Sequence, residues 1–158
     1  MFDVSKPNND LNMLSPFMRV KLEIALRDLW ANGIDMYVFE GWRSPSRQSF
    51  LYEQGRSAPG KIITNSKPWT SFHQFGVAID LVYKINNRWS WEGDFTKPAQ
   101  VMKKHGFEWG GDFKTFKDMP HYQITGGFTI QEAKAITDQF GVQAFWLAVN
   151  ERSSKSIA

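Results

Sequence analysis

Signals that start and stop helices divide this chain into short elements whose order is irregular. The serine–proline pairs at 15–16 and 44–45 are typical of helix starts, with serine as the cap and proline in the first turn. Gly33 and Gly55 end the two helices that begin there. Because strands and helices do not alternate regularly, we expect an α+β fold with a small, mainly antiparallel sheet flanked by helices.

Three segments have the β-rich composition of strands, at 34–40, 77–82 and 121–124. In the second segment, Asp80 lies on the opposite face from its apolar neighbours, because successive side chains of a strand alternate. The two asparagines at 86–87 then predict a hairpin turn. The pattern indicates a strand with one apolar face and one face that presents a carboxylate.

Residues 125–158 are expected to form helices only. Thr129 and Glu132 form a capping-box pattern, and Gly141 separates the helix that they begin from a last helix over 142–151. Since no internal repeat or linker divides the chain, we expect a single domain over residues 1–158.

The chain has no cysteine, so a metal site has to be built from histidine, aspartate and glutamate. Three histidines are available for such a site: His73, His105 and His121. The search for imidazole ligands is therefore short.

The charge of the chain is modestly positive, at +3. This excess suits an anionic polymer, but no dense basic stripe is present, so nucleic acid is not the expected partner. No apolar run approaches the ~20 residues that cross a bilayer. The first residues lack the pattern of a secretory signal, so we expect a soluble protein that is made and kept in the cytoplasm unless another factor exports it.

The chain contains seven tryptophans, several of which are bunched at Trp89, Trp91 and Trp109. Large aromatic side chains of this kind pack in the core or line a groove for an extended substrate.

Two histidines and one aspartate form the strongest candidate site. Zinc in catalytic sites takes three protein ligands at about 2.0–2.2 Å and keeps a fourth position for water. His73, Asp80 and His121 supply suitable atoms, and Gly76 lets the backbone bend between the first two. Without a bend, the extended chain would hold those two side chains ~23 Å apart.

A carboxylate and a guanidinium complete the candidate site. Asp118 precedes His121 by three residues, and Pro120 between them favours a turn that places Asp118 beside the metal as a general base. Arg43 is the candidate for the cation that stabilises a developing oxyanion. Taken singly, each residue also has an ordinary structural explanation, as a turn former or as half of an ion pair. His105 ends a helix and is given no role.

Three segments together resemble a family of zinc peptidases. Residues 71–80 match Ser-x-His-x-x-Gly-x-Ala-x-Asp, residues 118–121 match an acidic residue three before a histidine, and residues 41–48 match Gly-aromatic-Arg-Ser with a later glutamine. The family includes D-Ala-D-Ala carboxypeptidases and dipeptidases and phage L-alanyl-D-glutamate endopeptidases, and hedgehog signalling domains share its fold. The similarity covers roughly 19–123. The FEWGG sequence at 107–111 is similar to that of the phage endolysin subgroup.

The resemblance implies a role for each matching residue. It implies that Asp118 is the general base, that Arg43 stabilises the transition state, and that Ser71 and Gln48 contact the substrate. Many relatives have glutamate where this chain has Asp118, although endolysin-type relatives use aspartate. The resemblance assigns one Zn²⁺ per chain to His73, Asp80 and His121.

By this resemblance the chain is a monomeric peptidase that hydrolyses the L-Ala–D-Glu bond in peptidoglycan stem peptides, as a phage endolysin. Such an enzyme would be made in the host cytoplasm, without stable membrane insertion, and would reach the wall after membrane permeabilisation.

Other functions remain open at this point. The nearest alternative is a D-Ala-D-Ala carboxypeptidase or dipeptidase, because the metal chemistry is the same. A zinc-stabilised binding module without activity is opposed by the presence of Asp118 and Arg43. A glycosidase built on Glu40 and Glu92 has no support from their sequence context.

Overall fold

The first two helices form where the serine–proline pairs predict them. In the computed structural model, which describes residues 3–155, α1 (Pro16–Ala31) follows Ser15 and α2 (Pro45–Glu53) follows Ser44. The Ser44 side chain accepts a hydrogen bond from the backbone N–H of Arg47 at 3.1 Å, as a helix cap does. Ser15 makes no such side-chain bond.

Three further helices follow within residues 3–155. They are α3 (Thr96–Lys104), α4 (Ile130–Phe140) and α5 (Val142–Lys155). The predicted capping box of α4 is confirmed, because Thr129 and Glu132 each accept a backbone hydrogen bond from the other residue. The last helix runs four residues beyond the predicted end at 151.

The apolar residues of α1 do not all pack inward. Val20 and Ile24 are 54% and 50% exposed. The helix carries apolar residues on more than one face, so periodicity alone does not decide which face the sheet covers. The buried residues are Met18, Leu22, Ala25, Leu26 and Leu29.

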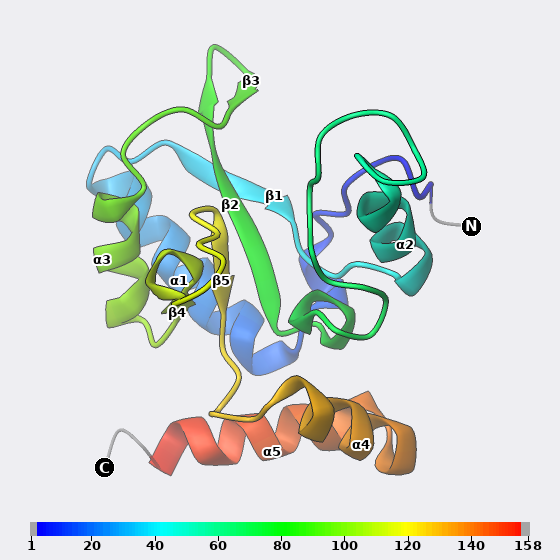
Figure 1. The fold of residues 1–158 in the computed structure, drawn as a ribbon. Helices are drawn as coiled ribbons and strands as arrows, with labels where there is room; N and C mark the ends of the chain where they lie inside the picture. The colour runs from blue at the N-terminus through cyan, green and yellow to red at the C-terminus, as the bar shows by residue number, and fades with distance from the viewer. Residues whose placement is uncertain (1–2, 156–158) are drawn as a thin grey trace.

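The sheet is small and antiparallel, as predicted. Along the main path its order is β1-β2-β5-β4, and β3 pairs with the far end of β2 (Figure 1). Asn86 and Asn87 form the turn between β2 and β3, with φ of 50° and 63°, as a tight hairpin turn requires. The strands are β1 (Met36–Glu40), β2 (Ala78–Ile85), β3 (Arg88–Ser90), β4 (Glu108–Trp109) and β5 (His121–Gln123).

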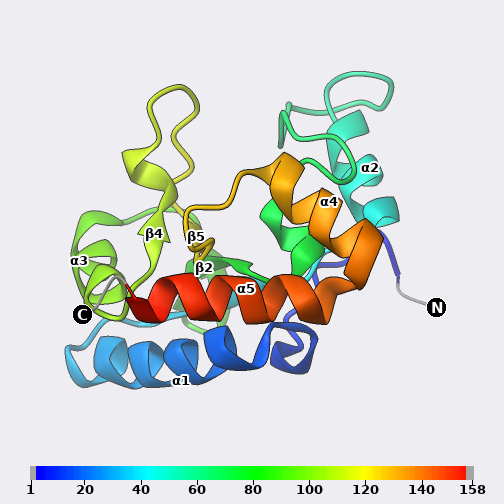
Figure 2. The same cartoon turned by 90° about the horizontal axis from the view of Figure 1, so that it is seen from below.

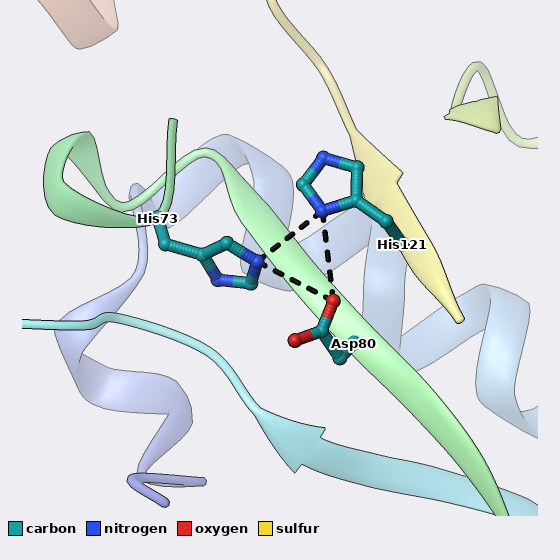
Figure 3. Close-up of side chains that lie close together, drawn as sticks. All are labelled: His73, Asp80 and His121. Atoms are coloured by element: carbon teal, nitrogen blue, oxygen red, sulfur yellow. Dashed lines mark hydrogen bonds and ion pairs between the residues drawn. The ribbon is translucent and has the colours of Figure 1, made fainter. Parts of the chain in front are cut away.

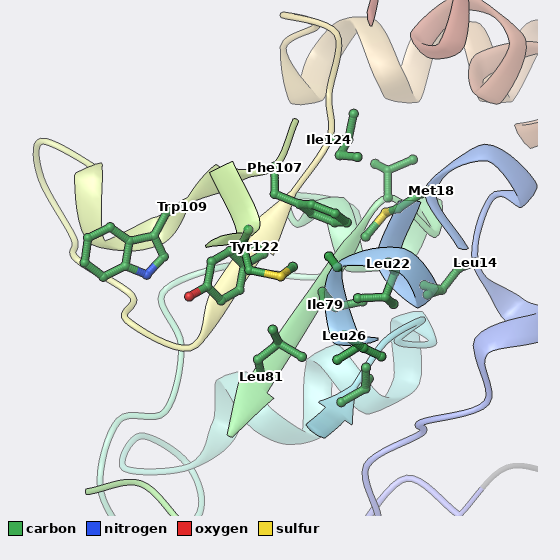
Figure 4. Close-up of a cluster of buried hydrophobic side chains, with 14 of the residues drawn as sticks. Leu14, Met18, Leu22, Leu26, Ile79, Leu81, Phe107, Trp109, Tyr122 and Ile124 are labelled. Carbon is green, nitrogen blue, oxygen red and sulfur yellow. The ribbon is translucent and has the colours of Figure 1, made fainter. Parts of the chain in front are cut away.

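One face of the sheet packs on the helices and forms the core. Figure 4 shows Ile79 and Leu81 of β2 near buried side chains of α1, with Tyr122 of β5 in the same buried cluster. Figures 1 and 2 show that α4 and α5 close one end of the molecule, and α5 adds Phe145 and Val149 to the core. The other face of the sheet is left to carry polar side chains.

Three short 3-10 helices complete the structure between residues 3 and 155: η1 (Leu11–Met13), η2 (Phe72–Phe75) and η3 (Gly110–Asp112). The last of these begins with the two glycines Gly110 and Gly111. Within the same residues, no helix is both long and apolar enough to span a bilayer.

Candidate metal centre and its cleft

Strand register places the candidate residues in one row across the sheet. Asp80 of β2 pairs with His121 of β5 on one side and with Glu40 of β1 on the other. A β-bulge between Val38 and Glu40 makes this possible, because it inserts Phe39 as an extra residue opposite β2. Val38 therefore faces the core, whereas Glu40 shares the face of Asp80.

His73 reaches the same place from the short helix η2. Ser71 caps that helix by accepting a hydrogen bond from the His73 backbone N–H, at 3.4 Å. Gly76 ends it with φ of 66°, a left-handed conformation that glycine adopts without strain. A Cβ at Gly76 would lie 3.0 Å from the carbonyl oxygen of Met13, so the site also lacks room for a side chain. The predicted bend between His73 and Asp80 is confirmed.

The three side chains converge on one point (Figure 3). His73 Nε2 lies 3.2 Å from His121 Nδ1, and Asp80 Oδ1 lies 3.4 Å and 3.5 Å from these two nitrogens. Two corners of a tetrahedron around zinc are about 3.3–3.6 Å apart when the bonds are 2.0–2.2 Å long. The observed triangle has the size that one face of such a tetrahedron requires.

Hydrogen bonds behind each imidazole set the direction of its free lone pair. His73 Nδ1 lies 2.7 Å from the carbonyl oxygen of Gly41, which can only accept, so Nδ1 carries the proton and Nε2 is free. His121 Nε2 lies 2.8 Å from Gln123 Oε1, which leaves His121 Nδ1 free. Two lone pairs facing each other at 3.2 Å repel unless a cation lies between them. The donor set therefore fits a metal ion.

A hydrogen bond to one oxygen of the Asp80 carboxylate likewise leaves its other oxygen free for a metal. Its Oδ2 accepts a hydrogen bond from Arg43 Nη2 at 3.1 Å, whereas Oδ1 is buried with no hydrogen-bond partner among residues 3–155 and faces the two imidazole nitrogens. Burial alone raises the pKa of Asp80, but the neighbouring His73, His121 and Arg43 together hold that pKa well below its usual range. The carboxylate is therefore ionised, with its unpaired oxygen directed at the two imidazoles.

The environment of His121 also favours positive charge at this point. Burial lowers the pKa of His121, but the hydrogen bond and charge of Asp80 more than offset burial and raise the pKa above its usual value. Because the surroundings stabilise a positive charge on this buried imidazole, they also stabilise a bound cation.

Arg43 lies behind Asp80 as part of a balanced network of buried charges. Its Nε and Nη2 donate to Glu40 Oε2 at 3.0 Å and 2.7 Å, and Arg47 Nε donates to Glu40 Oε1 at 2.8 Å. Two guanidinium groups thus face the two carboxylates of Glu40 and Asp80, which is how buried charges are tolerated. Arg43 positions a candidate ligand, and its contribution to oxyanion stabilisation stays a prediction.

Gln48 lies beneath the site, where it makes hydrogen bonds within the protein. It is fully buried, its Oε1 accepts from Arg43 and Gln74 at 3.0 Å each, and its Nε2 donates to the carbonyl oxygen of Ser66 at 2.7 Å. Both ends of the amide are used within the protein, so Gln48 holds Arg43 and the loop at Ser66, and its contact with a substrate stays a prediction.

Asp118 lies in the predicted turn before β5 and is held there by backbone contacts. Its N–H donates to the carbonyl oxygen of Gly110 at 3.0 Å, and its carbonyl oxygen accepts from His121 N at 3.2 Å. A Cβ at Gly110 would lie 2.2 Å from the Asp118 carbonyl oxygen, so glycine is required there. Burial, and then the charge of Asp80, raise the pKa of Asp118. A carboxylate with a raised pKa is a stronger proton acceptor.

A cleft of about 800 Å³ opens onto this site. Its lining includes the three candidate ligands together with Asp118 and Ser71. The Ser71 hydroxyl group accepts the η2 cap bond and can still donate its own proton into the cleft. Its predicted contact with a substrate is compatible with this position and stays a prediction.

Two supporting residues were not found by sequence reasoning. Gln123 lies two positions after His121, and this spacing places both side chains on one face of a strand, which was an available signal. Glu40 was considered for a glycosidase, but it is 2% exposed and bound to two arginines, so it supports the site instead. Glu92 is exposed and is not part of the cleft lining.

Fold and site together define a small peptidase with three residues, grouped in a cleft, that could hold a metal ion. A family model described as D-alanyl-D-alanine carboxypeptidase matches residues 64–124, the segment that contains the three candidate ligands and Asp118. The chain belongs to this peptidase family, and the resemblance seen in its sequence is confirmed.

Curated relatives and a solved structure support this assignment. The chain is 38% identical over 112 residues to the peptidoglycan L-alanyl-D-glutamate endopeptidase CwlK of Bacillus subtilis, covering 63% of this chain and 67% of the relative. It is 30% identical over 98 residues to the L-alanyl-D-glutamate peptidase of Listeria phage A118, covering 60% of this chain but 32% of that longer protein. The crystal structure of the Serratia marcescens L-Ala D-Glu endopeptidase ChiX superposes with a TM-score of 0.55 at 29% identity, covering 77% of this chain and 87% of that one.

Proposed function

We propose that this chain is a zinc-dependent endopeptidase that hydrolyses the L-Ala–D-Glu bond in peptidoglycan stem peptides. The observation that carries the proposal is the triangle of His73, Asp80 and His121 atoms at the floor of a cleft that Asp118 also lines. Support for the bond comes from the printed activities of the Bacillus, Listeria phage and Serratia relatives.

The donor atoms favour zinc among the common metals. Two imidazole nitrogens and one carboxylate oxygen, with no sulfur, match the ligand sets of catalytic zinc sites. Magnesium and calcium prefer sites made of oxygen atoms alone. A zinc ion at this position would supply a Lewis acid for the scissile carbonyl group and for water.

The protein's own residues do the remaining work of the reaction. Asp118 accepts the proton of the attacking water and returns it to the leaving amine, which is the role of a general base that then acts as an acid. The Gly41 carbonyl, Gln123 and Arg43 hold the three ligands so that they need not reorganise during turnover. Ser71 offers a hydroxyl donor to the substrate backbone.

A biological setting accompanies this proposal. The Listeria phage relative supports a role in wall lysis, with synthesis in the host cytoplasm and access to the wall after membrane permeabilisation. The net charge of +3 suits an anionic wall. We propose that one chain acts as a single catalytic unit without a stable partner subunit.

The alternative of a D-Ala-D-Ala carboxypeptidase is favoured by the description of the matching family model. Mass spectrometry of stem peptides digested by the zinc-loaded protein separates the two activities. Cleavage between L-Ala and D-Glu is the expected result. Release of D-Ala or D-Ala-D-Ala with the L-Ala–D-Glu bond intact would overturn the proposal in favour of the alternative.

A further inference from the structure

Three aromatic rings form a cluster on the surface beside the β2–β3 hairpin. The ring of Phe39, the bulge residue of β1, meets the rings of Trp89 and Trp91 edge-on, with centroid distances of 5.3 Å and 4.9 Å. Trp89 is 38% exposed and Trp91 is 52% exposed. The cluster is therefore ordered by its own ring contacts and yet open to solvent, as a binding surface is and a core is not.

This aromatic cluster, Phe39, Trp89 and Trp91, is continuous with the catalytic cleft. Phe39 and Trp91 belong to the same cleft lining as the candidate ligands and Asp118. Trp89 extends the cluster beyond the cleft, with the Lys84 ammonium group 5.2 Å from its ring centroid. A molecule that spans the site can thus reach the cluster without leaving the cleft.

The chemistry of the cluster suits a sugar ring better than the stem peptide. An indole face has negative partial charge, and it attracts the C–H bonds that line one face of a pyranose while the hydroxyl groups stay in water. Among residues 3–155, neither indole N–H of Trp89 and Trp91 has a hydrogen-bond partner, so both are available to a carbonyl or hydroxyl oxygen. Stem peptides instead carry carboxylates and small methyl groups, which better suit another part of the lining that contains Lys61 and Ile62.

We propose that the aromatic cluster is a subsite for the N-acetylated sugar to which the stem peptide is attached. The inference rests on the proposed function, because the first amino acid of the stem, L-alanine, is joined to that sugar. Hydrolysis after L-alanine then places the sugar only one residue from the metal centre, within the same cleft. The subsite makes the enzyme select stems that are still attached to the glycan.

Two substrates with the same stem peptide test the proposal, one free and one attached to its disaccharide. Wild-type protein loaded with zinc should hydrolyse the attached peptide with a kcat/KM about tenfold above that of the free peptide, the weight of one stacked ring. Trp91→Ala should lose most of this preference, because its kcat/KM should fall for the attached peptide and stay unchanged for the free peptide. Trp91→Phe, which keeps a ring, should retain part of it.

A matched control removes an exposed aromatic ring elsewhere. Phe140 of α4 is 67% exposed and is not part of the cleft lining, so Phe140→Ala should leave both substrates unaffected. Equal wild-type rates on the two substrates would overturn the subsite while leaving the proposed function standing, and this comparison needs no variant to fold. An equal loss on both substrates in Trp91→Ala would also overturn it. If the wild type cuts the L-Ala–D-Glu bond in neither substrate, the proposed function itself is wrong.

Discussion

Replacing Gln123 by methionine tests whether the ligand geometry is prepared before the metal arrives. Gln123 Oε1 accepts the proton of His121 Nε2 at 2.8 Å, and the two side chains are 8% and 7% exposed. Methionine has a similar length but no strong acceptor. His121 then has no fixed partner for Nε2, and its other nitrogen is no longer held free for the metal.

The size of the effect follows from what the bond does. A buried donor left without a partner costs about 1–3 kcal/mol. Outer hydrogen-bond partners of metal-bound histidines typically contribute about 10–100-fold in metal affinity, or about 1.4–2.7 kcal/mol. We therefore expect Gln123→Met to raise the zinc dissociation constant by about 10–100-fold.

The assay is competition between the protein and a zinc-sensitive chelating dye, with circular dichroism to check the fold. Gln123→Glu is the matched control, because its carboxylate keeps an acceptor at the same position and should preserve zinc affinity. A dissociation constant within twofold of wild type for a folded Gln123→Met protein would refute the reasoning. His121 would then be oriented by its strand alone.

Three further substitutions separate the roles of the site residues. Asp118→Asn should keep stoichiometric zinc but lose about 10²–10⁴ in kcat, measured by single-substrate kinetics on a stem peptide, and near-normal turnover would exclude Asp118 as the base. His73→Ala removes a ligand, so atomic absorption of the purified protein should show little zinc, and a full complement would count against the assigned set. Arg43→Lys keeps one charge but cannot hold Glu40 and Asp80 together, so it should weaken zinc binding and lower the free energy of unfolding by about 1–3 kcal/mol, measured by urea titration. Unchanged zinc affinity with a reduced kcat would assign Arg43 to the transition state instead.

Local signals predicted most of the fold. Serine caps, prolines in first turns and glycines after helices act over a few residues, so they are legible without tertiary structure. The two-residue strand Glu108–Trp109 was missed because so short a strand has no period to detect. Local signals do not set the inward face of α1, because the helix has apolar residues on more than one side and two of them, Val20 and Ile24, are exposed. That choice depends on long-range packing.

In the candidate site, residues with an uncommon type and spacing could be predicted from the sequence, whereas contacts that depend on the fold could not. His73, Asp80 and His121 were legible because their residue types and spacing are uncommon, and the structure brings them together. The role of the Gly41 carbonyl was not legible, because every residue carries that group. The burial of Gln48 depends on contacts with Arg43 and Gln74, and no local sequence pattern predicts such contacts.

The absence of space beside Gly110 limits where this enzyme can be redesigned. Its Cα packs so closely on the turn of Asp118 and on the Cβ of His121 that the smallest added methyl group would collide with both. Attempts to alter which peptide is accepted should therefore leave the bottom of the cleft intact and vary its walls. The exposed side chains of Ile62, Ile63 and Phe116 line those walls and have room to change.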